Sequence, residues 1–184
     1  GVVLDHLDED ALNRGFEAAL QCTGTLDILV NNAHAVDGND WTSVDADAFN
    51  RQMANASGYF LLARRLRDHV VERDCPGSVV MLGSMYGMVG SYPDTYEGIG
   101  PANPVHYQTL KGGVIQMARH LAVYWANDGV RVNCLSPGPF PSPAAPAPLV
   151  ERLSGKSPMG RMGQPHELAG ALLLLASPAG SYIT

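Results

Sequence analysis

The stretch Leu26-Asp27-Ile28-Leu29-Val30-Asn31-Asn32-Ala33-His34 decides the fold class. Leu26 to Val30 is a largely apolar run rather than a regular alternation of apolar and polar residues, which is typical of a parallel strand covered on both faces. The two asparagines leave the carboxyl end of that strand, and ligands bind at this end of the strands in open parallel sheets. The stretch therefore predicts a buried parallel strand that opens onto a ligand site.

The rest of the chain alternates between strand-like and helix-like segments. Gly112 and Gly113 predict a close approach of one helix to the sheet. The alternation predicts an α/β fold with a doubly wound parallel sheet and helices on both faces. The predicted strands are Val2–Leu4, Leu26–Val30, Ser78–Leu82 and Val130–Leu135, with another beginning at Ser181–Thr184, and the predicted helices run from Asp8 to Gly24, Asp45 to Arg73, Val105 to Asn127 and Pro165 to Ala176.

Composition limits the classes of partner. A chain of 184 residues with 46% hydrophobic content can build one domain with a sizeable core. The net charge is -6 without a basic run, so nucleic acid and anionic membranes are disfavoured as partners, and no apolar run approaches the ~20 residues that span a bilayer. Three widely spaced cysteines favour reduced thiols in a cytoplasmic protein. The histidines show no metal-ligand spacing, so we predict no catalytic metal.

The segment Tyr107-Gln108-Thr109-Leu110-Lys111 places a phenol and an ammonium one helical turn apart on one face. A free tyrosine has a pKa of about 10 and exchanges protons poorly at neutral pH. A neighbouring ammonium favours the phenolate, which suits general acid and base catalysis. The hydroxyl of Ser84 can hold a substrate oxygen beside the tyrosine. Taken alone, the pair also fits a plain packing contact between a ring and a lysine stem.

An ordered set of motifs adds to this pattern. Asn31-Asn32-Ala33, Asn55, Gly83-Ser84, Tyr107 with Lys111, and Pro137-Gly138 follow one another in an order that resembles the compact type of the short-chain dehydrogenase/reductase family. The resemblance covers about residues 1–184 and implies a single Rossmann-like domain that uses NAD or NADP. It implies that Tyr107 is the general acid or base, that Lys111 lowers its pKa and binds the nicotinamide ribose, that Ser84 orients the carbonyl, and that Asn55 completes a proton relay.

The same resemblance implies further cofactor contacts. Asn31 would support the sheet, whereas His34 stands where the family usually has glycine. The implied contacts are Asp5 and His6 at the adenine, Asn32 and Ala33 beside the ribose, Pro137 and Gly138 against the nicotinamide, Phe140 through its backbone, and Ser142 at the carboxamide. Paired asparagines also make plain turns, and an asparagine within a helix also serves in packing, so those alternatives stay open.

Two departures from the family pattern are expected. The glycine-rich turn that holds the pyrophosphate is missing, because Gly98-Ile99-Gly100 and Gly155-Lys156-Ser157 lack the required pattern. The first two strands and the last strand of the family fold are also expected to be missing, so the sheet would be incomplete at both ends. We expect such a fragment to bind cofactor poorly.

The gap of 23 residues between Ser84 and Tyr107 is longer than is common in the family. Its extra segment, residues 91–105, carries aromatic and acidic side chains and is expected at the mouth of the site, where such groups suit a hydroxylated substrate. A surface insertion without a role is the alternative. Residues 137–148 are rich in proline and match the substrate lid of the family, with a helix expected at Leu149–Leu153.

These observations predict an oxidoreductase that interconverts a secondary alcohol and a ketone on a sugar-like or sugar-acid substrate. The alternatives are a 3-oxoacyl thioester reductase, a sugar-nucleotide epimerase or dehydratase, and a non-catalytic dinucleotide-binding sensor. The resemblance further implies a homodimer or homotetramer that pairs through the two long helices.

Overall fold

The computed structural model describes residues 1–35 and 38–184. Within this part of the chain, three parallel strands form one sheet in the order β1-β2-β3. The strands are β1 (Ile28–Asn31), β2 (Gly77–Leu82) and β3 (Val130–Leu135); the helices are α1 (Glu9–Thr23), α2 (Ala46–Glu72), α3 (Pro93–Tyr96), α4 (Val105–Trp125), α5 (Ala147–Lys156) and α6 (Ala169–Ala176), with short 3-10 turns η1 (Met85–Gly87), η2 (Ala126–Asp128), η3 (Pro165–Leu168) and η4 (Pro178–Gly180).

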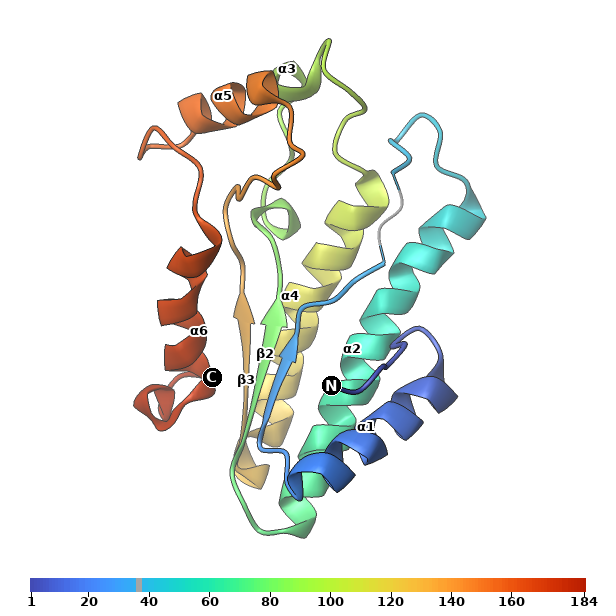
Figure 1. The fold of residues 1–184 in the computed structure, drawn as a ribbon, viewed down its shortest axis with the longest axis vertical. Coiled ribbons are helices and arrows are strands. Elements are labelled where there is room, and N and C mark those ends of the chain that lie inside the picture. Colours follow the sequence, from blue (N-terminus) through green and yellow to red (C-terminus); the bar gives the residue numbers. More distant parts are fainter. Residues whose placement is uncertain (36–37) are drawn as a thin grey trace.

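The sheet is covered by helices on both faces (Figure 1). Helices α2 and α4 pack on one face, with α1 against α2, and α6 packs on the other face over β2 and β3. The register pairs Ile28 with Ser78 and Gly77 with Val130, so all three strands end at one edge of the sheet. The prediction of a doubly wound parallel sheet with helices on both faces is confirmed, and α3 and α5 lie together above this edge.

The core lies between β2, β3 and the pair α2 and α4. Its side chains are apolar, and burial of each large one stabilises the fold by ~1.5–3 kcal/mol. The group includes Leu66, Val70, Val79, Met81, Leu110, Val114, Val130 and Val132, all at most 2% exposed. In the described ranges, no helix combines the length and apolarity that a transmembrane span requires.

The capping residues explain where the first helix begins and ends. The Asp8 side chain accepts a hydrogen bond from the backbone N–H of Ala11, which satisfies one of the free donors of the first turn of α1. Gly24 closes the helix with φ of 77°, a conformation that favours glycine. Both residues were predicted in these places from the sequence.

Two predicted strands are wrong. Val2–Leu4 has no strand geometry, and the Val3 side chain is 98% exposed, because no described strand lies beside this segment to pair with its backbone. Ser181–Thr184 also forms no strand, although the Thr184 hydroxyl accepts a hydrogen bond from the Val132 N–H. A strand needs a neighbour, so an apolar sequence alone does not produce one.

The sequence predicted that the strand Leu26–Val30 is buried on both faces, and this prediction is also wrong. Ile28 is 51% exposed and Val30 is 37% exposed. Helix α6 covers β2 and β3 but not β1, and the free edge of β1 has no partner among the described residues. The apolar side chains of this strand are therefore buried only on the face toward α2.

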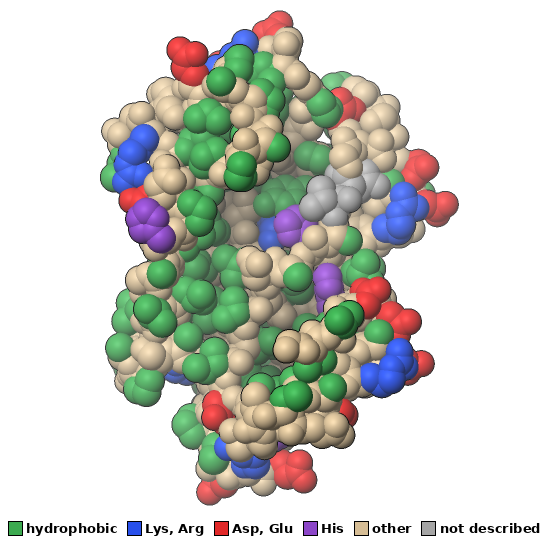
Figure 2. Space-filling view, in the orientation of Figure 1, with side chains coloured by type: hydrophobic (Ala, Val, Ile, Leu, Met, Phe, Trp, Pro, Cys, Tyr) green, Lys and Arg blue, Asp and Glu red, His purple; other side chains and the backbone are tan. Residues whose placement is uncertain are grey.

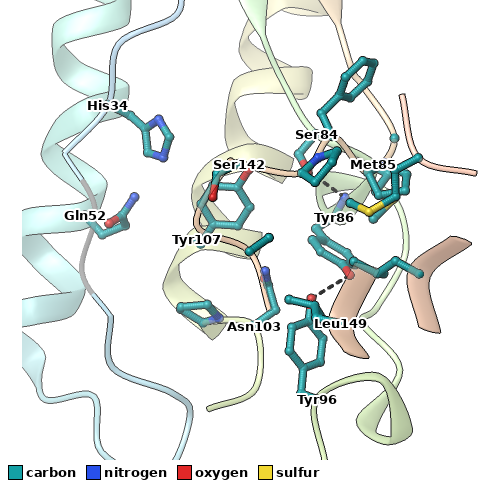
Figure 3. Close-up of a pocket in the computed structure, with 18 residues that line it drawn as sticks. His34, Gln52, Ser84, Met85, Tyr86, Tyr96, Asn103, Tyr107, Ser142 and Leu149 are labelled. Atoms are coloured by element: carbon teal, nitrogen blue, oxygen red, sulfur yellow. Dashed lines mark hydrogen bonds between the residues drawn. The ribbon is translucent and has the colours of Figure 1, made fainter. Parts of the chain in front are cut away.

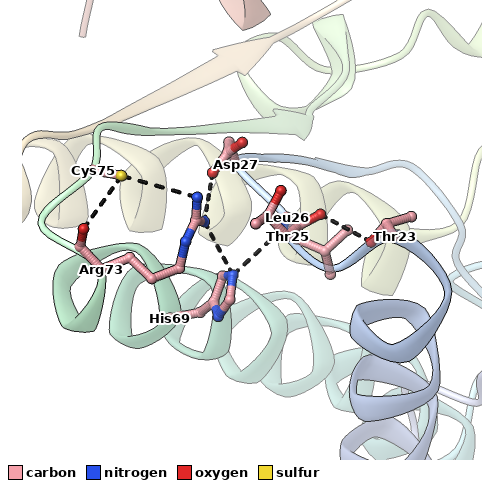
Figure 4. A network of polar contacts seen from close by, with 7 residues as sticks. All are labelled: Thr23, Thr25, Leu26, Asp27, His69, Arg73 and Cys75. Carbon is pink, nitrogen blue, oxygen red and sulfur yellow. Dashed lines mark hydrogen bonds and ion pairs between the residues drawn. The ribbon is translucent and has the colours of Figure 1, made fainter.

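A polar network joins the amino ends of β1 and β2 (Figure 4). The Arg73 guanidinium donates to the Asp27 carboxylate at 2.7 Å and contacts the His69 imidazole at 3.1 Å. The same imidazole nitrogen accepts from the Leu26 N–H at 3.4 Å. These contacts tie the turn after α1 to the turn after α2, and thereby support the register of the two strands.

The close approach of α4 to its neighbours occurs at Gly87 and not at the predicted pair of glycines. A Cβ at Gly113 would meet no atom within 4 Å, and a Cβ at Gly112 would lie 3.5 Å from the nearest one. A Cβ at Gly87 would instead lie 2.7 Å from the backbone carbonyl group of Lys111. The missing side chain at Gly87 therefore lets η1 lie directly on α4.

Gly87→Ala is expected to lower the free energy of unfolding by ~1–3 kcal/mol, because the added methyl group overlaps backbone that belongs to a packed helix. Gly170→Ala in α6 is the matched control, because a Cβ at Gly170 would meet no atom within 4 Å. This substitution is expected to be neutral or to stabilise the fold by up to about 1 kcal/mol. Urea unfolding measures both. Equal effects of the two substitutions would contradict the proposed contact.

Candidate functional site

A pocket of about 340 Å³ opens at the carboxyl ends of the strands. Figure 2 shows this face hollowed near its middle, with hydrophobic side chains around the hollow and most charged side chains near the outline. Ligand pockets commonly have volumes of ~300–1,000 Å³, so the space suits a small molecule. Its described lining consists of His34, Gln52, Ser84, Met85, Tyr86, Tyr96, Asn103, Pro104, Tyr107, Gly138, Pro139, Phe140, Pro141, Ser142, Ala145, Leu149, Leu153 and Met162.

Tyr107 and Lys111 lie where the helical spacing predicted them to lie, on one face of α4. The Lys111 Nζ atom is 5.7 Å from the centre of the Tyr107 ring and donates a hydrogen bond of 2.6 Å to the Leu82 carbonyl oxygen. Lys111 is 3% exposed, and this burial lowers its pKa. The ammonium is therefore held beneath the tyrosine by the last residue of β2.

Ser84 lies two residues beyond the end of β2 and is 8% exposed. Its Oγ accepts a hydrogen bond from the Tyr86 N–H at 3.2 Å, which begins the turn η1. The preceding Gly83 has no room for a side chain, since a Cβ there would lie 2.7 Å from the Cys134 sulfur. The loop after β2 therefore passes close to β3, and Ser84 and Tyr107 line the same pocket.

Asn55 is fully buried in α2, and its amide group holds the segment that follows β1. Its Oδ1 accepts from the Ala35 N–H at 2.8 Å and lies 2.9 Å from the His6 Nε2 atom. Its Nδ2 donates to the backbone oxygens of Gln52 at 2.9 Å and Ala35 at 3.3 Å. This side chain thus ties three segments together, which is the packing alternative for an asparagine within a helix.

Asn31 supports the sheet as the family resemblance implied. Its Nδ2 donates to the Tyr59 carbonyl oxygen at 2.9 Å, which fastens the end of β1 to α2. Tyr59 is buried beneath the site, and burial raises its pKa to about 12, so it stays a neutral phenol. The residues that follow Asn31 are held above the middle of α2.

The cofactor residues implied by the resemblance fall into two groups. Gly138, Phe140 and Ser142 line the pocket together with Tyr107. The other implied contacts, Lys111 among them, are not part of its lining. Asp5 is exposed, and its carboxylate accepts a hydrogen bond from the Leu7 N–H, whereas His6 contacts Asn55. Asn32 and Ala33 are exposed after β1, and the Pro137 carbonyl oxygen accepts a hydrogen bond from the Met85 N–H at 3.0 Å.

The insertion of residues 91–105 lies at the mouth of the pocket, as predicted. Its helix α3 is joined to α5, because the Arg152 guanidinium donates to the carbonyl oxygens of Asp94 at 2.8 Å and Glu97 at 2.7 Å. Lys156 forms an ion pair of 2.9 Å with Asp94. The proline-rich segment and α5, which is longer than the predicted helix at Leu149–Leu153, therefore cover the pocket as one unit with the insertion.

Some pocket residues were missed by reading the sequence. Tyr86 and Tyr96 share a hydrogen bond of 2.8 Å between their hydroxyl groups, and Asn103 also lines the pocket (Figure 3). Gln52 is 2% exposed and lies one helical turn before Asn55. Its polarity on the buried face of α2 was the one available signal. The contact between Tyr86 and Tyr96 depends on how the insertion folds back, which no local pattern reports.

His34 projects into the pocket beside Tyr107, with their ring centres 5.7 Å apart. Burial lowers the pKa of His34, and the positive charge of Lys111 lowers it further. The imidazole is therefore neutral near pH 7, and it presents one donor and one acceptor. A side chain at this position narrows the pocket where glycine would leave it open.

A larger hollow of about 910 Å³ lies at the opposite ends of the strands. Its two arginines are engaged by the protein itself: Arg73 pairs with Asp27, and Arg131 donates to the carbonyl oxygens of Leu175 and Ser177. None of the predicted site residues lines it. Among the described residues, no cluster of three or more His, Cys, Asp or Glu has the geometry of a metal site.

Comparison with known proteins agrees with this geometry. A family model described as enoyl-(acyl carrier protein) reductase matches residues 2–184. The chain is 35% identical over 189 residues to galactitol 2-dehydrogenase (L-tagatose-forming) from Cereibacter sphaeroides, and the alignment covers 100% of this chain and 70% of that protein. The chain belongs to the short-chain dehydrogenase/reductase family.

Solved structures of short-chain dehydrogenases share the fold. One from Leptospira borgpetersenii with bound NAD+ is 28% identical with a TM-score of 0.89, over 98% of this chain and 69% of that one. A gluconate 5-dehydrogenase from Burkholderia cenocepacia in complex with NADP and tartrate is 25% identical with a TM-score of 0.86, over 100% of this chain and 70% of that one. As a member of this family, the chain is an oxidoreductase by class.

The buried Lys111 is expected to make the stability of this dehydrogenase depend on pH. Its pKa is lowered in the folded state, so between that lowered pKa and 10.5 the unfolded chain binds more protons than the folded chain does. Burial of the charged ammonium lowers the free energy of unfolding at lower pH, and the free energy of unfolding therefore rises as the pH increases across this interval. Lys111→Met should lack this gain. Urea unfolding of both proteins at several alkaline pH values measures it, and parallel pH curves would refute the expectation.

Proposed function

We propose that the protein interconverts a secondary alcohol and a ketone with NAD or NADP, on a sugar-like or sugar-acid substrate. One observation carries the proposal: Ser84 and Tyr107 line one pocket, with the Lys111 ammonium 5.7 Å from the tyrosine ring. The similarity to a galactitol 2-dehydrogenase and to the structure of a gluconate 5-dehydrogenase supports a hydroxylated substrate. A 3-oxoacyl thioester is the alternative substrate, because half of the described lining residues are apolar and the matching family model is described as an enoyl-(acyl carrier protein) reductase.

The residues around the site fit a nicotinamide cofactor. Lys111 Nζ can donate three hydrogen bonds, and the Leu82 oxygen is the one acceptor assigned to it within residues 1–35 and 38–184. Two donors of a buried cation are thus available for ribose hydroxyls. A Cβ at Gly138 would meet no atom within 4 Å, which leaves open space beside the pocket for a planar ring. Ser142 would offer its hydroxyl to the carboxamide.

The bound nicotinamide would supply or accept the hydride, and the protein would handle the proton. Tyr107 would donate its hydroxyl proton to the carbonyl oxygen during reduction and take it back during oxidation. Ser84 would hold the same oxygen through its hydroxyl, and Lys111 would stabilise the negative charge that develops on the tyrosine oxygen. These three roles need the three side chains at one place, and α4 and the turn after β2 bring them there.

Asn55 would serve this reaction as a positioning residue. All polar atoms of its side chain are engaged by Ala35, Gln52 and His6, so its amide holds the segment after β1 against α2. This segment carries His34 and the two implied ribose contacts. Loss of the amide would shift these groups relative to Tyr107.

A second copy of the chain is proposed to pack on α2 and α4. Val123 is 75% exposed and Tyr124 is 68% exposed near the end of α4, and Val71 near the end of α2 is 40% exposed. A second copy packed against these two helices would bury all three side chains. Light scattering should give the mass of a dimer or tetramer, and Tyr124→Glu should lower it. A monomeric mass at micromolar concentration would refute the interface.

Tyr107→Phe is expected to abolish turnover, by at least ~100-fold, while cofactor binding persists, because the ring and its packing remain but the proton donor is lost. The assay follows NAD(P)H absorbance with polyols, sugar acids and 3-oxoacyl thioesters. Tyr92→Phe is the matched control, since Tyr92 is 61% exposed and lies outside the pocket lining. Turnover that survives in the Tyr107→Phe variant would overturn the mechanism, and tight cofactor binding without turnover in the wild type would favour a sensor.

A further inference from the structure

The Gln52 side chain is a buried amide with an unused donor. It is 2% exposed, and its Nε2 atom has no hydrogen-bond partner among the described residues. Its backbone oxygen accepts from the Asn55 amide at 2.9 Å, so its place on α2 is fixed. Buried side-chain amides in native proteins are nearly always hydrogen-bonded. Because Gln52 also lines the pocket, a ligand oxygen is one group that would satisfy this donor.

Gln52 and His34 both line the pocket, and the His34 ring also approaches Tyr107, with their ring centres 5.7 Å apart. In Figure 3 these two side chains extend from one side of the pocket, and Ser84, Tyr107 and Ser142 lie on the other side. A substrate whose reacting oxygen lies between Ser84 and Tyr107 would extend across the pocket toward Gln52. In that pose the amide would donate to an oxygen at another carbon of the substrate. A simple secondary alcohol has no such oxygen.

The pocket combines apolar and polar side chains and carries no charged side chain among its described lining residues. Its hydrogen-bonding groups are amides, hydroxyls and one imidazole, and burial lowers the pKa of that imidazole, so it is neutral near pH 7. A carboxylate that enters such a pocket loses its hydration and finds no cationic side chain in the described lining to pair with, since Lys111 lies behind Tyr107. Hydroxyl groups lose less, because each neutral donor or acceptor can replace a water. The lining therefore favours a neutral polyol or its ketose over a sugar acid.

We infer that Gln52 donates a hydrogen bond from Nε2 to a hydroxyl oxygen remote from the reacting carbon, and so selects neutral polyhydroxylated alcohols and ketones. This inference rests on the proposed dehydrogenase function and narrows its substrate class. Gln52 would determine specificity without taking part in proton or hydride transfer. The Gln52 backbone oxygen meanwhile continues to hold Asn55.

The test compares Gln52→Leu with the wild type on galactitol, gluconate and cyclohexanol. Leucine has a similar volume and lacks the amide, so kcat/KM for galactitol is expected to fall roughly 10- to 100-fold, mainly through KM. The value for cyclohexanol and the cofactor Kd should stay unchanged. The melting temperature should stay the same or rise, since an unpaired buried donor has been removed. The wild type should prefer galactitol to gluconate.

Gln21→Leu is the matched control, because Gln21 is exposed on α1 and is not part of the pocket lining. Calorimetric binding of galactitol in the Tyr107→Phe background, with and without Gln52→Leu, separates this inference from the proposed chemistry. Binding that weakens on the second substitution supports the role of Gln52 even if turnover is absent. The inference would be overturned if kcat/KM fell equally for cyclohexanol and galactitol, if cofactor binding weakened, or if the melting temperature fell. It would also be overturned if the wild type preferred gluconate or if galactitol did not bind.

Discussion

The hydrogen bond from Lys111 Nζ to the Leu82 carbonyl oxygen is the contact on which the site depends. It joins the middle of α4 to the end of β2, so the helix that carries Tyr107 and the loop that carries Ser84 share one anchor. Burying an ammonium against a neutral oxygen is costly, and the lowered pKa of Lys111 records that cost. The apolar packing of α4 on β2 and β3 offsets it. No carboxylate pairs with this lysine among the described residues, so its charge remains available to the tyrosine.

A second constraint holds the other wall of the pocket. Asn55 and Asn31 both reach from one element to the backbone of another, and together they fix the end of β1 and the segment after it on α2. His34 is carried by this segment and Gln52 by α2 itself. The pocket therefore has one wall built on α4 and β2 and another on α2 and β1. The distance between the walls is set by the sheet, because its strands pair in register from Ile28 to Leu135.

The sequence predicted those parts of the site that depend on local geometry. Helical periodicity placed Tyr107 and Lys111 on one face, and the apolar run before Asn31 placed the asparagines at the end of a strand. It failed where a segment needs a distant partner, as at Val2–Leu4, whose backbone has no described strand beside it. It also failed at Gly112 and Gly113, because the close approach lies at Gly87 in another segment. Long-range contacts of this kind follow from packing and have no local signature.

The absence of charge in the described pocket lining also bears on the chemistry. In the proposed reaction, Lys111 stabilises negative charge on the Tyr107 oxygen, and the strength of this effect depends on how little its field is cancelled nearby. A substrate carboxylate in the same low-dielectric space would oppose that field and weaken the effect on the tyrosine. In the proposed complex, the hydroxyl groups of a neutral substrate bring dipoles and no net charge, so they oppose the lysine field less than a carboxylate does. In the proposed reaction, the neutral lining and the buried lysine would therefore act together, and both would favour a substrate without net charge.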